Sequence, residues 1–571
     1  MLIQKIVFRE GEHPSLYFRG GSLKDGKIKL KAGERLSFDT YFSSFTYTKY
    51  RKYTTAKEIT FKAELCGEYT LMLCIYDGKC ETVISSVKGS GASALTAILS
   101  ELPEAAILYP VIEAITDTDF ISGEYLADAE AQDISCAIAI CTYKREDYVK
   151  NNLKIIGRAE LSHIDGVLVV DNGNTLLPEE IEIGAVRLFK NKNYGGSAGF
   201  TRGIIEAKRG GFSHVILMDD DIEIYPEAIN RITVFASILK YEYKNAHFSA
   251  AMLPQTKKYI QHEKGALWNG SHIESLNTGL DLREKDSLIK NLNDGPIAYG
   301  AWWCFCLPLS DVEEFGLPLP LFIKFDDVEY GTRTCRSAPI ITMSGMAISH
   351  ADFDLKYNMH LEYYTVRNQL IMLAVHNMQN RFGCLLRLMK VFAKHLFLYR
   401  YSASPIIMRA FSDFLLGADF IMNTDAEELN RSVMGMAPKA QVLSGLDEWR
   451  EDMRLAEYSK KSSFPFIIKM LLLGGHLIPR AFMKKELAAI SLPGADVGDS
   501  FMYKRTVQYQ IGSDSGYVFE KSSPKFFACI IRGIAMSFKI LFCYGRAKRS
   551  FIKNKEYITS EKFWKEYLSI D

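Results

Sequence analysis

The chain has 571 residues, of which 48% are hydrophobic and 24% are charged, and its formal net charge is +1. A chain of this length exceeds one domain and indicates about three or four domains, each with a buried core. The nearly neutral charge argues against a protein that binds nucleic acid through bulk electrostatics.

The cysteines and the N-terminus predict where the protein works. The 11 cysteines are scattered and form no C-x-x-C pair, which is typical of a reducing compartment. The first residues, Met1 to Arg9, lack the architecture of a signal peptide. No run of about 18 uncharged apolar residues occurs, so we expect no membrane-spanning helix. A cytoplasmic protein is expected.

Residues 1–130 have the pattern of a β-rich domain. Apolar and polar residues alternate in the runs Lys27–Lys31 and Glu58–Leu65, and turn signals such as Asp77-Gly78 separate such runs. Short strands with regular turns indicate a β-sandwich or a barrel. Without a catalytic constellation, a binding or assembly role is the default for this domain.

The pattern changes near Asp133. Mostly apolar runs at 135–141, 166–170, 185–189 and 215–218 alternate with helical stretches, as in a parallel sheet covered on both faces. Ligands of such sheets gather at the carboxyl ends of the strands. The polar residues that follow the first three runs are Thr142, Arg145, Asp171, Asn172 and Asn193.

Three carboxylates follow the fourth apolar run. Side chains alternate along an extended chain, so Asp219 and Asp221 point to one side and Asp220 to the other. Two converging carboxylates repel each other unless a cation lies between them, and oxygen ligands suit Mg²⁺ or Mn²⁺. The alternative is a solvated acidic turn.

A glycine-rich turn with Gly195 and Gly196 joins a strand to a helix. Glycines allow close approach of the backbone to a ligand, and the helix N-terminus offers unpaired N–H groups to a phosphate. The turn matches neither a Walker loop nor a dinucleotide fingerprint. Further on, Trp302 and Trp303 follow Gly300 and suggest either a platform for a sugar ring or an aromatic core cluster.

A second acidic pair, Asp326-Asp327, ends another apolar run. Asp327 is a candidate general base for a hydroxyl nucleophile, whereas Asp326 would cap the helix or orient its neighbour. His350 ends a strand-like run and could complete the site begun by Asp219 and Asp221. Tyr364 and Arg367 share a helical face, where the cation could balance a leaving phosphate or form a packed ion pair.

The chain is helical in pattern from about residue 361. Helices are expected at Leu361–Met378, Cys384–Tyr399 and Ile406–Met422. Between Lys521 and Lys555 the chain has nine Lys or Arg and no Asp or Glu, interleaved with aromatic and aliphatic residues. Such a helix suits the headgroup layer of an anionic membrane, and the alternative is a helix packed on the protein with a basic rim.

Taken together, the motifs resemble those of the galactofuranosyltransferases that build galactan, which are family 2 glycosyltransferases with a GT-A fold. The motifs, between residues 133 and 370, are T-x-x-R, D-N-G, N-x-G-G-S-x-G-F, M-D-D-D, G-x-W-W, I-K-F-D-D-x-E-Y-G, S-H and Y-Y-x-x-R-N. The segment after His350 departs from the family, which has a tryptophan-bearing segment there.

The resemblance implies a multidomain α/β protein: an N-terminal β-sandwich (1–130), a GT-A (Rossmann-like) domain (131–370) and a C-terminal helical domain (371–571). It also implies a UDP-sugar donor, a glycan or lipid-linked acceptor, and Mn²⁺ or Mg²⁺. The implied roles are a metal site of Asp219, Asp221 and His350, the base Asp327, UDP contacts from Arg145, Asn172 and Asn193, and a sugar or acceptor site lined by Trp302 and Trp303. We also expect nucleotide-sugar contacts from Thr142, Asp171, Gly195, Gly196 and Asp220, and acceptor or sugar contacts from Asp326, Tyr364 and Arg367.

We therefore expect an inverting, metal-dependent transferase of cell-surface polysaccharide synthesis, peripheral on the inner face of the cytoplasmic membrane. UDP-galactofuranose is the expected donor, and UDP-glucose or another nucleotide-hexose is the alternative. A non-catalytic glycan-assembly subunit and a nucleotidyltransferase are the rival functions. Association into a homo-oligomer is left open by the sequence.

Overall fold

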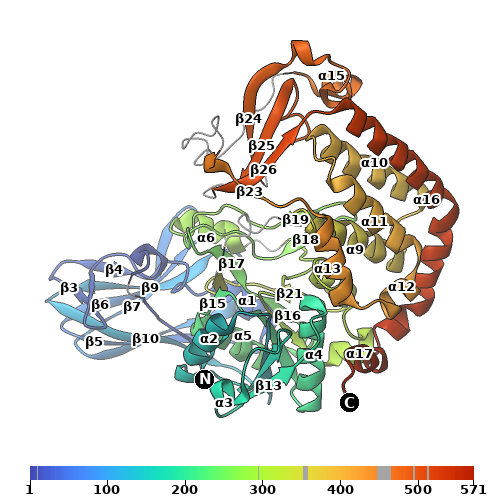
Figure 1. The fold of residues 1–571 in the computed structure, drawn as a ribbon. Helices are drawn as coiled ribbons and strands as arrows, with labels where there is room; N and C mark the ends of the chain where they lie inside the picture. Colours follow the sequence, from blue (N-terminus) through green and yellow to red (C-terminus); the bar gives the residue numbers. More distant parts are fainter. Residues whose placement is uncertain (10, 293–294, 352–357, 446–463, 493–494, 511–513) are drawn as a thin grey trace. The chain divides into compact units, whose positions relative to one another are not determined.

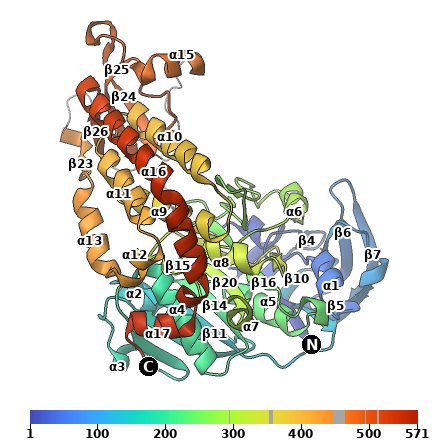
Figure 2. The same cartoon turned by 90° about the vertical axis from the view of Figure 1, so that its right-hand side faces the viewer.

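The computed structural model of the chain describes residues 1–9, 11–292, 295–351, 358–445, 464–492, 495–510 and 514–571 (Figure 1; Figure 2). It divides into two compact units. Unit 1 comprises Met1–Pro318 and Asp327–Ala351, and unit 2 comprises Leu319–Asp326 and Asp352–Asp571. The expected boundaries near residues 130 and 370 stay a prediction.

Two antiparallel sheets occupy residues 2–128, in agreement with the β-rich pattern. One sheet has the order β2-β3-β10-β5-β8, with β1 also pairing with β10, and the other has the order β4-β9-β6-β7. Their strands are β1 (Leu2–Lys5), β2 (Ser22–Lys24), β3 (Lys27–Leu30), β4 (Arg35–Ser37), β5 (Glu58–Cys66), β6 (Tyr69–Tyr76), β7 (Glu81–Gly89), β8 (Ala92–Ile98), β9 (Ile107–Ala114) and β10 (Thr118–Asp128). Helix α1 (Tyr47–Tyr53) lies between β4 and β5 in the chain. The layout of this part as a separate β-sandwich domain stays a prediction.

A mixed sheet of order β13-β12-β11-β14-β20-β16-β21 forms the centre of the α/β region. Its strands are β11 (Cys136–Thr142), β12 (Ile164–Asp171), β13 (Val186–Lys190), β14 (His214–Asp219), β16 (His247–Ser249), β20 (Cys304–Pro308) and β21 (Ile340–Ile341). The first four strands in this order are parallel, as expected, whereas β20 runs antiparallel to β14 and β16.

The register of these strands collects their polar ends at one edge. Thr142 pairs with Asp171, and Cys141 pairs with Asp219, so the carboxyl ends of β11, β12 and β14 lie side by side. A small sheet of β15 (Ile222–Glu223), β22 (Ala347–His350) and β17 (Ala251–Pro254) pairs Ile222 with His350. His350 is thereby brought to the acidic end of β14.

Helices and a hairpin complete unit 1. The helices are α2 (Glu146–Arg158), α3 (Pro178–Ile181), α4 (Gly195–Arg209), α5 (Pro226–Ser237), α6 (Lys285–Leu292), α7 (Ser310–Phe315) and α8 (Asp326–Thr334). The first residue of α8 belongs to unit 2. The hairpin consists of β18 (Ala266–Trp268) and β19 (Ile273–Ser275). Gly199 of α4 lies so close to β11 that an added Cβ would be 2.1 Å from the Cys141 Sγ atom. The glycine therefore sets how closely this helix approaches the sheet.

Unit 2 contains helices and, contrary to the expectation of a purely helical region, a four-stranded sheet of order β23-β26-β25-β24. These strands are β23 (Gln441–Val442), β24 (Lys484–Leu492), β25 (Tyr503–Gln510) and β26 (Ser515–Glu520). Val507 and Tyr509 of β25 pack with Leu443 in a small core, so alternating apolar residues form strands there.

Unit 2 contains the three helices expected from the sequence and further helices beside them. They are α9 (Leu361–Val375), α10 (Arg381–Phe397), α11 (Ala403–Leu415), α12 (Ala418–Asn423), α13 (Ala426–Met436), α15 (Phe466–Leu471), α16 (Ser523–Ile558) and α17 (Glu561–Leu568). The three expected helices correspond to α9, α10 and the pair α11 and α12. The single helix expected at Ile406–Met422 is split at Gly417, whose φ of 85° no right-handed helix allows.

Helix α16 spans 36 residues and is long and apolar enough, by length and composition, to cross a membrane. The sequence-based expectation of no membrane-spanning helix rests on the absence of a long uncharged apolar run, and α16 carries Arg532 and Lys539 among its apolar residues, so the expectation stays a prediction. A single helix of this kind does not establish a membrane span, because helices of soluble proteins pass the same test.

Candidate functional site

Asp219, Asp221 and His350 form a cluster at the carboxyl edge of the central sheet. One potential ligand atom from each lies within 4.8 Å of the others. The Nε2 atom of His350 is 3.2 Å from Oδ1 of Asp221 and 3.7 Å from Oδ2 of Asp219. The strand pairing of Ile222 with His350 accounts for this proximity.

The charges in this cluster fit a divalent cation. Burial lowers the pKa of His350, but hydrogen bonds to Asp219 and Asp221 outweigh it and raise the pKa to about 9. The Nδ1 atom is 2.6 Å from the carbonyl oxygen of Ala351, so Nε2 is the nitrogen that faces the carboxylates. Without an ion, a protonated imidazole supplies the positive charge that the two carboxylates require. A divalent cation would take over that charge, because His350 must release its proton to become a ligand, and two oxygens with one imidazole suit Mn²⁺ or Mg²⁺.

Asp220 lies in the turn that follows β14. Arg145 Nη1 contacts both its carboxylate and that of Asp221, so the opposite orientation expected from alternation stays a prediction. The Asp220 carboxylate accepts hydrogen bonds from Thr142 Oγ1 (2.8 Å) and Arg145 Nη1 (2.9 Å). Arg145 also pairs with Asp221 at 2.8 Å, and Asn152 of α2 donates to the Asp220 carbonyl at 2.8 Å. These contacts fix the acidic turn and place a guanidinium beside the metal-capable cluster.

The Asp171 carboxylate organises its own loop. Its Oδ1 accepts the N–H of Gly173 at 2.8 Å, and its Oδ2 accepts those of Thr175 and Leu176 at 2.7 and 2.8 Å. Asp171 is fully buried. The contacts in the structure are those of a loop-capping residue, and the predicted role in nucleotide binding stays a prediction.

Asn172 connects this loop to the glycine-rich turn. Its side chain donates to the Gly195 carbonyl at 3.0 Å and accepts from Asn191 Nδ2 at 2.9 Å. Gly195 has φ of 79°, a conformation that side chains rarely adopt, and Gly196 follows it in the first turn of α4. Asn193 is partly exposed on the loop before this helix. The turn expected to receive phosphate therefore lies at the same sheet edge as Asp219.

The two tryptophans are almost completely buried. Trp302 is 4% exposed and contacts the ring of Phe200, and Trp303 is 5% exposed and donates its Nε1–H to the Ala250 carbonyl at 2.8 Å. The backbone carbonyl of Trp303 also accepts the N–H of Asp219. These contacts favour the aromatic-core alternative, and a direct sugar contact stays a prediction.

Asp327 lies in the first turn of α8 and is partly exposed, and its Oδ1 accepts the N–H of Val328. The charge of Asp327 acts on the buried residues Glu263 and Tyr299. Burial, reinforced by Asp327, raises the pKa of Glu263 to about 7. Sequence reasoning missed Glu263 because an isolated Glu in a polar stretch carries no signal until the fold buries it.

Asp326 begins α8 and is buried. In unit 2, the loop that leads to it is held by α9. Arg367 Nη2 donates to the Leu321 carbonyl at 2.9 Å, and Asn368 Nδ2 donates to the carbonyls of Leu321, Ile323 and Lys324, each at 2.9 Å.

Tyr364 stacks on Phe322 of this loop and donates to Asn430 at 3.1 Å. Both Arg367 and Tyr364 are buried. Their contacts are those of residues that support the loop, and their predicted roles at the sugar or acceptor stay predictions.

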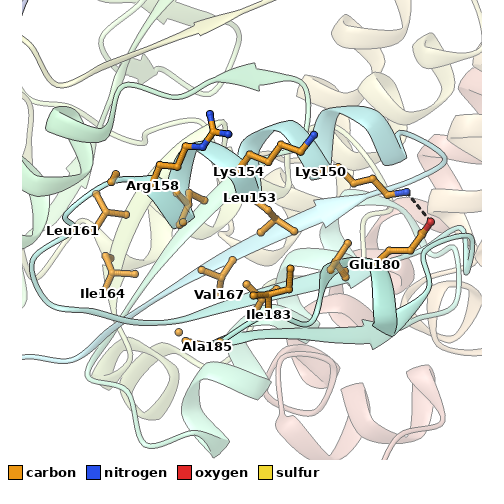
Figure 3. Close-up of a pocket in the computed structure, with 17 residues that line it drawn as sticks. Lys150, Leu153, Lys154, Arg158, Leu161, Ile164, Val167, Glu180, Ile183 and Ala185 are labelled. Atoms are coloured by element: carbon orange, nitrogen blue, oxygen red, sulfur yellow. Dashed lines mark ion pairs between the residues drawn. The ribbon is translucent and has the colours of Figure 1, made fainter.

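An open cavity of about 620 Å³ lies elsewhere, beside α2 and β12 (Figure 3). Leu153, Ile164 and Ile183 line it, and an ion pair between Lys150 and Glu180 at 3.0 Å lies at its edge. None of the sequence-predicted site residues lines this cavity. Residues 352–357, which follow His350, lie outside the described residues.

Comparison with known proteins agrees with the motifs. No family model matches the chain. The galactofuranosyltransferase GlfT2 of Mycobacterium tuberculosis is 25% identical over 504 residues, which cover 81% of this chain and 77% of the relative. GlfT2 of Mycolicibacterium smegmatis is 26% identical over 457 residues, which cover 73% and 70%.

Two solved structures have weaker similarity. A mannosyltransferase from Pyrobaculum calidifontis in complex with GDP-Man and Mn²⁺ is 12% identical, covers 54% of this chain and 86% of its own, and has a TM-score of 0.31. Glucosyl-3-phosphoglycerate synthase from Mycobacterium tuberculosis, in complex with Mn²⁺, uridine diphosphate and product, is 9% identical, covers 42% and 78%, and has a TM-score of 0.28. The curated relatives confirm the resemblance that the motifs predict: the chain is a glycosyltransferase related to the galactofuranosyltransferases.

Proposed function

We propose that the chain is an inverting, metal-dependent galactofuranosyltransferase that extends a glycan or lipid-linked acceptor with galactofuranose from UDP-galactofuranose. The observation that carries this proposal is the cluster of Asp219, Asp221 and His350 in a chain whose curated relatives are galactofuranosyltransferases.

In the proposed reaction, Asp327 accepts the proton of an acceptor hydroxyl. The hydroxyl oxygen forms a bond to the anomeric carbon of the donor as the bond from that carbon to the diphosphate oxygen breaks. UDP leaves with the electron pair, and attack from the opposite face inverts the anomeric configuration. Asp327 suits this role because its partly exposed carboxylate can meet a hydroxyl, whereas Asp326 is buried.

Asp219, Asp221 and His350 would hold the divalent ion, and the ion when bound supplies positive charge to the departing diphosphate. Arg145, which immediately precedes α2, would add a second positive charge, because its guanidinium already lies against Asp220 and Asp221. Asn172 and the glycine-rich turn would hold the nucleotide side of the donor at the same edge.

The donor and the reaction class are tested together by incubating the protein with Mn²⁺ and a panel of nucleotide sugars. Release of UDP from UDP-galactofuranose, with less from UDP-glucose, supports the proposal. Preference for UDP-glucose would identify another hexosyltransferase. Release of pyrophosphate would indicate a nucleotidyltransferase, and no release with any donor would indicate a non-catalytic glycan-assembly subunit.

The proposal includes peripheral attachment to the inner face of the cytoplasmic membrane through the basic segment Lys521–Lys555. Most of this segment lies in α16, which packs in unit 2 through buried residues, among them Met536, Ile540 and Tyr544. Its other side exposes large apolar residues: Phe527, Ile531, Ile534, Phe538 and Phe542. Packing on the protein and membrane contact were alternatives at the sequence level, and the two different sides of α16 support a proposal that includes both.

Flotation with vesicles of anionic phosphatidylglycerol tests this attachment. Because α16 supports the fold through its buried side, the exposed side is changed instead: Phe538→Asp with Phe542→Asp should reduce vesicle binding. Unchanged binding by this double variant would exclude α16 as an attachment site.

A further inference from the structure

In the segment from Phe464 to Phe482 of unit 2, large apolar side chains are exposed to solvent and small or polar residues are buried. Phe466, Ile467, Leu471, Leu477 and Phe482 are each more than half exposed. The buried residues of the same segment are Gly474, Gly475 and His476. A segment that buries glycine and histidine while it exposes phenylalanine, isoleucine and leucine presents its apolar side chains away from its own unit.

The base of this segment is firmly attached to unit 2. His476 stacks on Phe526 with ring centroids 4.0 Å apart and forms a 2.6 Å hydrogen bond with Tyr401 Oη. Ser523 of α16 donates to the His476 carbonyl at 3.1 Å. Gly474 is so close to Phe397 that an added Cβ would be 2.6 Å from its ring. The exposed apolar side chains therefore project from an anchored base.

The charges of the segment indicate which partner covers it. Residues 464–482 contain two cations, Lys469 and Arg480, and no Asp or Glu, and Lys484 and Lys485 follow directly. Arg480 pairs with Glu520, which leaves an excess of positive charge beside the segment. A second copy docked through the same patch would place these like charges near one another across the two-fold axis. An anionic lipid surface satisfies both features, since it accepts apolar side chains and attracts the cations beside them.

The length of the segment limits how deeply it can enter a membrane. Helix α15 has six residues, so it is about 9 Å long. Interfacial helices bury their apolar faces about 5–10 Å deep at the boundary of headgroups and acyl chains. A helix of this length fits into one leaflet and cannot cross the bilayer.

We propose that residues 464–482 form a monotopic membrane-inserting segment that enters one leaflet of an anionic bilayer. The segment lies next to the start of α16, as the contacts of His476 with Phe526 and Ser523 require. In Figures 1 and 2, α15 lies at one end of unit 2. The segment extends the membrane contact proposed for α16 and does not depend on the identity of the sugar donor.

The test uses the full chain and vesicles of phosphatidylglycerol or phosphatidylcholine. Ile467→Asp replaces a side chain that is 70% exposed, and Ile183→Asp is a matched control at a 75% exposed position in unit 1. We expect Ile467→Asp to lower the partition coefficient onto phosphatidylglycerol vesicles at least about tenfold, since one buried isoleucine supplies that much apolar transfer. The control should bind like the wild type.

Insertion is measured directly in a second variant, Leu471→Trp. Lipids brominated on the acyl chain should quench its added fluorescence when the protein binds phosphatidylglycerol vesicles. The proposal would be overturned if brominated lipids quench the fluorescence of Leu471→Trp no more than that of the wild type. It would also be overturned if Ile467→Asp and the wild type bind vesicles equally. A fall in oligomer size in Ile467→Asp with unchanged vesicle binding would also overturn it and assign the patch to a second copy. All these outcomes are independent of sugar transfer.

Discussion

The loop that leads into the acidic pair at Asp326 and Asp327 should depend on Asn368. Phe322, Lys324 and Phe325 have φ of 72°, 69° and 68°. Each left-handed residue other than glycine costs about 1–2 kcal/mol, so the loop stores roughly 3–6 kcal/mol. The loop keeps this conformation because α9 binds its carbonyls, and the two N–H donors of Asn368 Nδ2 are shared among three of them.

Asn368→Leu preserves the shape of the side chain and removes the donor. At about 1 kcal/mol for each of the two N–H donors, the local opening free energy should fall by ~2 kcal/mol. Amide hydrogen exchange in residues 321–325, measured by mass spectrometry, should then accelerate by about 30-fold. Turnover should fall as well, because displacement of a catalytic group by about 1 Å can cost 10²-fold.

A matched control is Asn554→Leu, which removes one hydrogen bond to Ser550 within α16. It should leave exchange in the loop and turnover unchanged. If the amides of residues 321–325 in Asn368→Leu exchange at rates within about threefold of those in the wild type, the free energy assigned to these hydrogen bonds is wrong.

Three further predictions concern the site in unit 1. Asp219→Ala and His350→Ala should each abolish the increase in UDP affinity that Mn²⁺ produces; calorimetry that finds this increase intact in both would contradict the metal assignment. Asp327→Asn should bind donor normally but lose about 10²–10⁴-fold in turnover, since it removes a positioned base; near-normal turnover, with Asp326→Asn inactive, would reverse the two roles. Burial raises the pKa of Glu263 from 4.5 to about 7, so the folded chain holds a proton there that the unfolded chain releases as the pH rises through this window. Glu263→Gln should therefore raise the free energy of unfolding at pH 8 by up to ~3 kcal/mol relative to the wild type, which thermal unfolding detects as a higher unfolding temperature. It should have little effect at pH 4.5, and equal effects at both pH values would refute this.

Sequence reasoning located the acidic edge because of strand periodicity. Apolar runs followed by polar residues are typical of parallel strands, and parallel strands bring their carboxyl ends together. The convergence of Asp219 and Asp221 was expected from alternation, and their carboxylates lie 3.7 and 3.2 Å from His350 Nε2. The approach of His350 needed the pairing of β22 with β15, which no local pattern specifies.

Other features depend on tertiary burial and were not predictable. The sequence cannot distinguish a tryptophan that stacks on a sugar from one that fills a core, and the structure buries both Trp302 and Trp303. Arg367 has the charge of a phosphate ligand, but its contacts are with loop carbonyls. The apolar run near Phe466 has the composition of a core helix, and only its exposed fraction indicates a membrane surface.

The most direct test of inverting, metal-dependent transfer is the structure of the product. The protein is incubated with UDP-galactofuranose, Mn²⁺ and a galactofuranose-terminated oligosaccharide, and the new linkage is analysed by NMR spectroscopy. We predict one added galactofuranose whose anomeric configuration is opposite to that of the donor, and no product after chelation of the metal. A product with the configuration of the donor, or transfer that survives chelation, would contradict the proposed function.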